Sequence, residues 1–290
     1  MRIWFLGTAA GGGLPQWNCA CPGCRAARDG GRSLRQDTLA VSGDGRSWYL
    51  LNAAPDLRLD APELRPGPGL RETPVRGVVL TSAELDHTTG LLGLREATAL
   101  TVFATRPVLA AVPALPLLDH YTAVTRGPLT SGVAVALEGG LTVTPFPLGA
   151  KRPRYATGRA TGAPGEDWVV GLRLSDGRST MVYAPCLAAW SAELADANLV
   201  ILDGTFFTDD ELLRSTGVRR TARQMGHLPI EESLPMLAPG VRYLYTHLNN
   251  TNPVARPDSA QRAALRRHGA DVAPEGEILS LGGPHHLVDL

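Results

Sequence analysis

Residues 77–90 read GVVLTSAELDHTTG, an apolar run followed within a few residues by an adjacent aspartate and histidine. The run 77–81 has the composition of a buried strand, and the pattern of 85–97 predicts a helix. Asp86 and His87 therefore lie on a strand-to-helix turn, and in layered α/β proteins such turns gather at the sheet edge where ligands bind. Taken alone, the pair could also be a helix N-terminal carboxylate beside an incidental histidine.

The same arrangement occurs twice more along the chain. Asp203 follows the apolar run 199–202, and His247 follows another such run. With Asp86 and His87 they supply two imidazoles and one or two carboxylates, a ligand set that suits non-haem Fe(II), with Zn²⁺ or Mn²⁺ as alternatives. We therefore expect one active-site divalent metal ion, with Asp203 either a ligand or a partner that orients one.

His227 precedes a helix predicted over 230–237. It could act as a general acid or base, or as a hydrogen-bonding partner of Asp203, so that the two residues tune the metal or the substrate. A histidine that only caps or packs is an equally good interpretation. The remaining histidines have no comparable context and are expected to be ordinary surface or core residues: His120, His268, His285 and His286.

Residues 19–24 read CACPGC and place three thiols within six residues on a loop with proline and glycine. Zn²⁺ prefers tetrahedral thiolate and imidazole ligands, and a tight turn lets three sulfurs converge on one ion. We predict a zinc site formed by Cys19, Cys21 and Cys24, with three free thiols as the alternative. A fourth protein ligand, which the spacing does not identify, would make this zinc structural, and the contact of a homodimer is one place for it. Cys186 is expected to be a small buried apolar side chain.

The composition excludes some classes of partner. The 290 residues contain 28 basic and 28 acidic side chains, so no net charge favours nucleic acid or an anionic membrane, and a small-molecule substrate is expected. No run approaches the roughly 18 apolar residues of a membrane-spanning helix, and the apolar run 2–6 is too short for the core of a signal peptide. We therefore expect a cytoplasmic protein with a single domain over residues 1–290, in a reducing compartment that favours metal binding over disulfides.

Strand-like and helix-like segments alternate along the chain, which predicts an α/β layered fold. Runs rich in β-branched and aromatic residues are the expected strands. They cover 2–6, 39–42, 48–51, 77–81, 133–137, 141–145, 168–174, 180–184, 199–202 and 242–246. Helices are expected over 85–97, 187–195, 209–215 and 259–268.

Five motifs of the chain read GGGLPQWNCAC at 11–21, DHTTGLL at 86–92, DGT at 203–205, MGHL at 225–228 and HLNNTNP at 247–253. Together they resemble the family of coenzyme PQQ synthesis protein B, a distant branch of the metallo-β-lactamase superfamily, over almost the whole chain. The resemblance implies a four-layer αββα sandwich of two mixed sheets with a metal site at the strand ends.

The resemblance also shows where this chain departs from the superfamily. The superfamily motif H-x-H-x-D-H reads SAELDH at 82–87, so both leading histidines are missing. The aspartate that bridges two metals in hydrolytic relatives is replaced by the sequence APC at 184–186. These losses argue against a two-metal hydrolase, because little remains to hold the second ion.

The resemblance implies a role in the biosynthesis of pyrroloquinoline quinone (PQQ). Asp86, His87 and His247 carry over as metal ligands, and the implied reaction is a metal-dependent hydroxylation of the tyrosine ring of a Glu-Tyr-derived precursor. A mononuclear site of two histidines and a carboxylate leaves positions for O₂ and substrate. We expect Arg95 and Glu96 to contact the amino-acid ends of that substrate. The alternatives are a carrier of PQQ or its precursor that assists transport to the periplasm, and a residual metallo-hydrolase.

Overall fold

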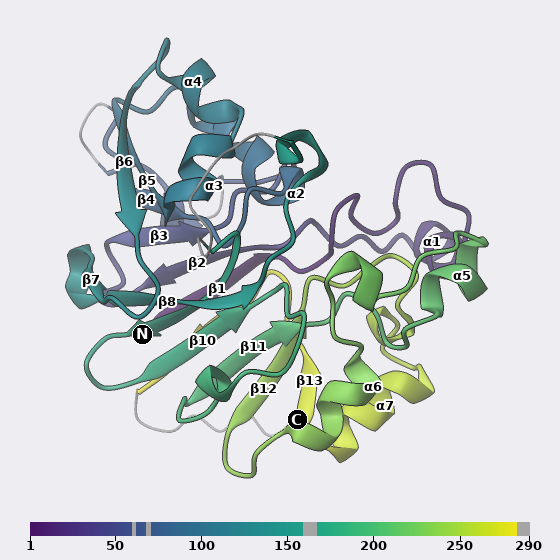
Figure 1. Ribbon diagram of the computed structural model, residues 1–290. Helices are drawn as coiled ribbons and strands as arrows, with labels where there is room; N and C mark the ends of the chain where they lie inside the picture. Colours follow the sequence, from purple (N-terminus) through teal and green to yellow (C-terminus); the bar gives the residue numbers. More distant parts are fainter. Residues whose placement is uncertain (60–61, 68–70, 159–166, 283–290) are drawn as a thin grey trace.

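The protein folds into two mixed β-sheets packed face to face, with helices on both outer faces (Figure 1). The computed structural model describes residues 1–59, 62–67, 71–158 and 167–282, so His285 and His286 lie outside the described residues. This architecture confirms the predicted αββα sandwich. No helix in these described ranges is both long and apolar enough to cross a bilayer.

The first sheet has seven strands in the order β14-β1-β2-β3-β4-β5-β6. Its pairings are antiparallel from β14 to β3 and parallel from β3 to β6. The strands are β1 (Arg2–Gly7), β2 (Thr38–Ser42), β3 (Trp48–Leu51), β4 (Val75–Val79), β5 (Ala99–Thr105), β6 (Ala123–Leu129) and β14 (Ile278–Ser280).

The second sheet has seven strands in the order β13-β12-β11-β10-β9-β8-β7. Its pairings are antiparallel from β7 to β10 and parallel from β10 to β13. The strands are β7 (Val135–Ala136), β8 (Thr142–Gly149), β9 (Val169–Ser175), β10 (Thr180–Ala184), β11 (Leu199–Asp203), β12 (Arg242–Thr246) and β13 (Ala270–Val272).

The helices are short and cover the two outer faces (Figure 1). The α-helices are α1 (Pro22–Asp29), α2 (Leu85–Thr88), α3 (Arg106–Ala111), α4 (Ala114–Leu118), α5 (Glu211–Thr216), α6 (Ile230–Ser233) and α7 (Ala260–Arg267). The 3₁₀ helices are η1 (Pro62–Leu64), η2 (Thr89–Leu94), η3 (Glu138–Gly140), η4 (Arg154–Ala156), η5 (Ala192–Leu194), η6 (Arg223–Met225), η7 (Leu234–Met236) and η8 (Pro253–Ala255).

The central core lies between the sheets. Phe5 and Leu39 from the first sheet pack in one cluster with Leu172 and Tyr183 from the second, and all four are fully buried. Burying a large apolar side chain contributes about 1.5–3 kcal/mol, so this layer holds the sheets together. Two further clusters fill the space between each sheet and its covering helices.

Several predicted elements differ from the structure. The helix expected over 187–195 is wrong, because only η5 is helical there. Leu187 is instead tied to other segments, since its N–H donates to Asp203 and its carbonyl accepts from Leu228. The strand expected over 133–137 shrinks to β7, and the helix expected over 85–97 is α2 followed by η2.

Candidate metal centre

The ends of five strands open into one cleft of about 690 Å³. Loops after β1, β4, β10, β11 and β12 all contribute to its lining, through Gly11, Asp86, Cys186, Thr205 and His247 respectively. A side chain at position 11 would crowd the carboxylate of Asp86, because a Cβ there would lie 3.0 Å from Asp86 Oδ2. The strand order thus gathers residues from most of the chain length around one space, as expected for loops at a shared sheet edge.

Two buried imidazoles face each other in the cleft. The ring centroids of His87 and His247 are 5.2 Å apart, with the ring planes at 78°. The Nε2 atoms of both are buried and, in the part of the chain that the structure describes, neither makes a hydrogen bond. The carboxylate oxygen Asp86 Oδ2 lies 3.4 Å from His247 Nε2. An unpaired buried polar atom costs about 1–3 kcal/mol, so two such atoms together indicate that a ligand binds between them.

The hydrogen bonds of Thr205 decide which nitrogen of His247 carries the proton. Thr205 Oγ1 lies 2.6 Å from Asp203 Oδ1 and 2.8 Å from His247 Nδ1. A carboxylate can only accept, so the single hydroxyl proton of Thr205 goes to Asp203. Nδ1–H of His247 must then donate to Thr205, which leaves the Nε2 lone pair directed into the cleft. An imidazole held in this tautomer is prepared to bind a cation.

His87 is held in a similar way from the opposite sheet. Its Nδ1 lies 2.8 Å from Ser82 Oγ and 3.3 Å from Thr81 Oγ1. Burial lowers the pKa of His87 to about 4, against the opposing charge of Asp86. The ring is therefore neutral near pH 7 and can use an unprotonated Nε2 as a ligand.

Charge and backbone conformation also single out His247. Burial alone would lower its pKa, but the carboxylate of Asp86 beside the ring, with further charge from Asp37 and Asp203, raises the pKa above its ordinary value. In return, His247 and His87 hold the pKa of Asp86 below its ordinary range although burial opposes this. His247 adopts a φ of 56°, in the left-handed region. That conformation is uncommon for a residue other than glycine and is often found at functional sites.

Asp203 is the centre of a buried hydrogen-bond network. Its Oδ2 lies 2.7 Å from His227 Nδ1 and accepts from the N–H of Leu187, and its Oδ1 accepts from the N–H and hydroxyl of Thr205. The His227 ring stacks on that of His247, with centroids 5.7 Å apart. Burial would raise the pKa of Asp203, but the nearby imidazole of His227 and these bonds lower it. The carboxylate therefore orients both imidazoles from the side away from the cleft.

Cys186 is a site residue that the sequence analysis assigned to packing. One ligand atom each from His87, Cys186 and His247 lies within 4.8 Å of the other two. Burial raises the pKa of this thiol well above its ordinary value, and the charges of Asp203 and Asp86 raise it further. The only available signal was its position, directly after a predicted strand and where hydrolytic relatives carry a bridging aspartate.

The two predicted carboxylate ligands, Asp86 and Asp203, differ in how they lie relative to the imidazoles of the cleft. Asp86 contacts His247, but among the described residues it belongs to no set of three ligand atoms within 4.8 Å of one another. Asp203 does form such a set with His227 and His247. In that set, however, the atoms are already linked through Thr205 and the Nδ1 atoms, so Asp203 acts as an orienting partner rather than facing the cleft.

Arg95 and Glu96, which the sequence analysis placed on the substrate, are not among the residues that line the cleft. Both are exposed, and they pair with each other at 3.3 Å. In the sequence they come directly after η2, which separates them from α2. The cationic side chains that do line the cleft lie elsewhere in the sequence: Lys151, Arg152, Arg154 and Arg220.

A buried carboxyl group links the strands below the cleft. Asp37 is 1% exposed and accepts hydrogen bonds from the hydroxyls of Tyr183 on β10 and Thr246 on β12. Tyr183 also accepts from Asn52, whose Oδ1 accepts from Thr81. Burial raises the pKa of Asp37 to about 6, although these hydrogen bonds oppose the shift. The network ties the first sheet to the second directly beneath the two imidazoles.

The loop after β12 is fastened by a second buried carboxyl group. Glu211 accepts from the Thr251 hydroxyl and from the N–H of Phe207, both at 2.6 Å. Burial raises its pKa to about 7, against the effect of these two bonds. Below pH 4.5 both the folded and the unfolded chain hold this proton. Above it the unfolded chain loses the proton first, so stability falls until the pH passes about 7.

We expect Glu211→Gln to remove this pH dependence. Glutamine offers an acceptor to Phe207 and a donor to Thr251 without a charge, so at pH 8 the variant should be more stable than the wild type by at most roughly 3 kcal/mol. Urea unfolding at pH 5 and pH 8 measures the difference. Exposed Glu193→Gln is the control and should leave the profile unchanged. Parallel pH profiles for wild type and Glu211→Gln would contradict the argument.

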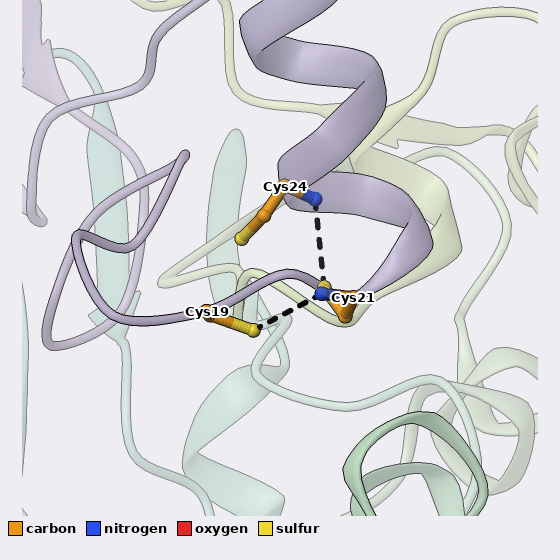
Figure 2. Close-up of side chains that lie close together, drawn as sticks. All are labelled: Cys19, Cys21 and Cys24. Carbon is orange, nitrogen blue, oxygen red and sulfur yellow. Dashed lines mark hydrogen bonds between the residues drawn. The ribbon is translucent and has the colours of Figure 1, made fainter.

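The three cysteines of residues 19–24 converge at the start of α1 (Figure 2), and none of them is among the residues that line the cleft. Their sulfurs lie within 4.8 Å of one another. Each sulfur accepts a backbone N–H at 3.4 Å, Cys19 from Cys21, Cys21 from Cys24 and Cys24 from Gln16. Such hydrogen bonds stabilise thiolates. The geometry therefore suits the predicted zinc site, although the loop is already helical from Pro22.

The sequence of this chain is similar to a family model and to named relatives. Residues 47–247, which include both imidazoles, match the family model of the β-lactamase superfamily domain. The chain is 40% identical to coenzyme PQQ synthesis protein B of Azoarcus sp. (strain BH72), over 97% of this chain and 100% of the relative. It is 44% identical to the protein of the same name from Ruegeria pomeroyi, over 95% of this chain and 98% of the relative.

Solved structures show the same fold. A crystal structure of Zn²⁺-bound PqqB from Methylobacterium extorquens superposes with a TM-score of 0.88 at 35% identity, covering 97% of this chain and 100% of that one. A diphosphatase of the PhnP family superposes with a TM-score of 0.66 at 18% identity, over 96% and 97% of the two chains. The second likeness is one of fold alone.

Proposed function

The chain belongs to the family of coenzyme PQQ synthesis protein B and acts in PQQ biosynthesis, and we propose that it does so as a metal-dependent hydroxylase of an aromatic ring. The observation that supports this most directly is the pair of buried, unpaired Nε2 atoms of His87 and His247 beside the carboxylate of Asp86. The substrate we propose is the tyrosine ring of a Glu-Tyr-derived precursor.

The donor set of the cleft fits a divalent cation. His87, His247 and Asp86 would hold the ion, and the Cys186 thiol lies within reach of both imidazoles. Two imidazoles and a carboxylate are typical of non-haem Fe(II), and Zn²⁺ also accepts this set. When bound, a redox-active ion such as Fe(II) supplies the one-electron chemistry that O₂ activation requires.

The positions that would hold a second ion are already engaged. Ser82, at the first missing histidine, bonds the His87 ring, and Glu84, at the second, pairs with Lys151 at 3.3 Å. Two-metal hydrolysis needs an ion on each side of the attacked group. A single ion with free positions for O₂ and substrate suits hydroxylation better.

His227 and Asp203 are placed to move a proton at the substrate. With Nδ1–H of His227 directed to Asp203, its Nε2 is free to accept, and the residue lines the cleft. We assign His227 the role of general base toward the phenol proton of the ring, oriented by Asp203. This stacked arrangement with His247 places the base next to the metal ligands.

The cationic wall, defined as Lys151, Arg152, Arg154 and Arg220, supports a negatively charged substrate. Lys151 is paired with Glu84, and the guanidinium of Arg152 lies 5.2 Å from the Trp168 ring. Arg154 and Arg220 are exposed at the cleft. An amino-acid precursor with several carboxylates would meet these groups while its ring reaches the imidazoles, since guanidinium binds carboxylate through paired hydrogen bonds.

We expect Arg154→Ala to weaken substrate binding more than it slows the reaction. Loss of one charge-assisted contact should raise KM roughly five- to tenfold with kcat changed less than twofold. Steady-state kinetics measure both values. Arg95→Ala, which removes an exposed arginine outside the cleft, is the matched control. If Arg95→Ala raised KM while Arg154→Ala did not, the substrate would bind elsewhere.

The test of the proposed function is direct. Hydroxylation inserts one oxygen atom of O₂ into a ring C–H bond and releases the other as water, so each turnover consumes two protons and two electrons from an external reductant. Anaerobically prepared Fe(II) protein is given the Glu-Tyr-derived diamino acid precursor, ascorbate and ¹⁸O₂. A gain of one ¹⁸O atom per ring hydroxyl, absent from the Zn²⁺ protein, is the expected result.

A carrier is the second candidate, because the cationic wall would also hold an anionic product. Tight PQQ binding to the metal-free protein, with no oxygen uptake by the Fe(II) protein, would favour the carrier. Cleavage of an ester without oxygen uptake would instead indicate a hydrolase.

A further inference from the structure

Lys151 is the only lysine among the 28 basic side chains of the sequence. It comes shortly after β8 and lines the cleft. Because every other basic position is an arginine, a need for positive charge alone does not explain the lysine here. An ammonium is a compact charge with donors that turn about a single atom, whereas a guanidinium is a rigid planar fork that suits carboxylates. This position therefore favours a ligand with one negatively charged oxygen.

The side chain of Lys151 contacts two segments of the cleft. Its Nζ lies 3.3 Å from Glu84 Oε1, at the start of α2. Its stem passes Gly226 so closely that a Cβ on this glycine would lie 3.1 Å from Lys151 Cδ. Gly226 also has a φ of 86°, a conformation that favours glycine. The ammonium is thus held between α2 and the residue that precedes His227.

Glu84 is a firmly placed partner for this ammonium. Its N–H donates to Ser82 Oγ at 3.2 Å, and its carbonyl accepts from the N–H of His87. The charge of Lys151 also reaches the groups around the proposed ion. It lowers the pKa of His87, and it opposes the rise in the pKa of the Cys186 thiol. The ammonium therefore acts electrostatically on the deep part of the cleft as well as on its mouth.

The proposed reaction, on which this inference rests, creates an anion that needs such a cation. When Nε2 of His227 takes the phenol proton, the electron pair of the O–H bond stays on the ring oxygen as a phenolate. His227 directly follows Gly226, so the base and the ammonium enter the cleft from neighbouring positions. Lys151 has three N–H donors, and the contact with Glu84 Oε1 uses one of them.

We propose that Lys151 is a catalytic residue whose ammonium binds the phenolate oxygen of the substrate ring as His227 takes the phenol proton. The ammonium keeps its own protons, so the step moves one proton from oxygen to nitrogen and breaks no other bond. Arg154 and Arg220 remain for the carboxylates of the substrate. A substrate with phenylalanine in place of tyrosine would lose the contact with Lys151.

The experiment follows the ionisation of a chromophoric phenol bound to the Zn²⁺ protein, in which no hydroxylation is expected. The probe is the dipeptide of glutamate and 3-nitrotyrosine, whose absorbance reports whether its phenol is ionised. In the wild type, the bound probe should ionise at a lower pH than the free probe. Lys151→Met should raise the ionisation midpoint of the bound probe by about 1 pH unit, because a nearby opposite charge lowers a pKa by about that much or more.

Arg152→Met is the matched control, because it removes one positive charge of the cationic wall at the next residue. Both side chains are exposed, so neither substitution removes a buried group. The control should move the midpoint by less than about half as much as Lys151→Met. Equal shifts in the two variants would show a general effect of the wall and would overturn the role of Lys151.

The outcomes separate this inference from the proposed function. A wild type that binds the probe without lowering its ionisation midpoint would overturn the role of Lys151 alone, whereas a wild type that does not bind the probe would contradict the proposed substrate as well. Kinetics give a second measurement. Lys151→Met should lower kcat about tenfold with KM within about twofold of the wild type, the reverse of Arg154→Ala. A raised KM with unchanged kcat would show that Lys151 only binds substrate.

Discussion

Replacing His247 by alanine is expected to remove the proposed metal ion from the cleft and to lower the rate of the proposed hydroxylation by about 10³-fold or more. The reason is that metal stabilisation of the reacting oxygen contributes several kcal/mol, and each 1.4 kcal/mol is tenfold in rate. His247 supplies a free Nε2 whose tautomer is fixed through Thr205, and no other described imidazole faces both His87 and Asp86. The loss should therefore not be rescued by a neighbouring side chain.

Metal content and rate should be measured on the same preparations. His268→Ala is the control, because among the described residues this exposed imidazole bonds the Ala264 carbonyl, at 3.0 Å, and lies outside the cleft. It should keep both metal and rate. A His247→Ala protein that binds one ion in the cleft and still hydroxylates would show that the reaction is carried by another site.

Replacing Asp203 by alanine is expected to cost about 3–5 kcal/mol of unfolding free energy. The substitution leaves four buried donors without this acceptor: the N–H groups of Leu187 and Thr205, the Thr205 hydroxyl and the Nδ1–H of His227. Removing one member of a buried, hydrogen-bonded network is among the largest single-residue effects. The unfolding free energy of Asp203→Asn should lie between those of the wild type and the alanine variant. The asparagine oxygen still accepts hydrogen bonds, but its NH₂ group faces other donors and cannot accept from them.

Chemical denaturation gives these free energies directly. Asp119→Ala is a suitable control, because Asp119 is exposed and paired with Arg126, and such pairs contribute at most about 1 kcal/mol. If Asp203→Ala lost no more stability than Asp119→Ala, the hydrogen bonds of Asp203 would contribute little to the free energy of unfolding. The assignment of Asp203 as the orienting residue of both imidazoles would then fail.

The site residues that could be predicted from the sequence are those that come after a predicted strand. Asp86 and His87 follow an apolar run within a few residues, Asp203 and His247 follow theirs directly, and parallel strands carry their ends to one edge. The αββα fold was predicted from the resemblance, because the alternation of elements alone leaves the layer order open. Strand β6 escaped detection because its sequence, AVTRGPL, carries glycine and proline at a partly exposed sheet edge.

The parts that could not be predicted depend on tertiary contact. Cys186 differs from a buried packing cysteine only because β10 ends beside the two imidazoles. The helix expected over 187–195 has alanine-rich composition, but its backbone bonds Asp203 and Leu228 instead, and tertiary contacts override propensity. Arg95 was expected at the substrate but lies outside the cleft, whereas Arg154 reaches the cleft from a distant segment of the chain.

The Asp37 network has a consequence for how substrate preference can change in evolution. This carboxyl group joins β10 and β12 and connects through Tyr183 and Asn52 to the first sheet, so buried hydrogen bonds tie the floor of the cleft to both sheets. The cationic wall, in contrast, comes from exposed loop residues outside that network. Mutations in the wall can therefore alter which molecules enter while the chemistry below is inherited unchanged, so relatives that share this floor are free to diverge in what they bind.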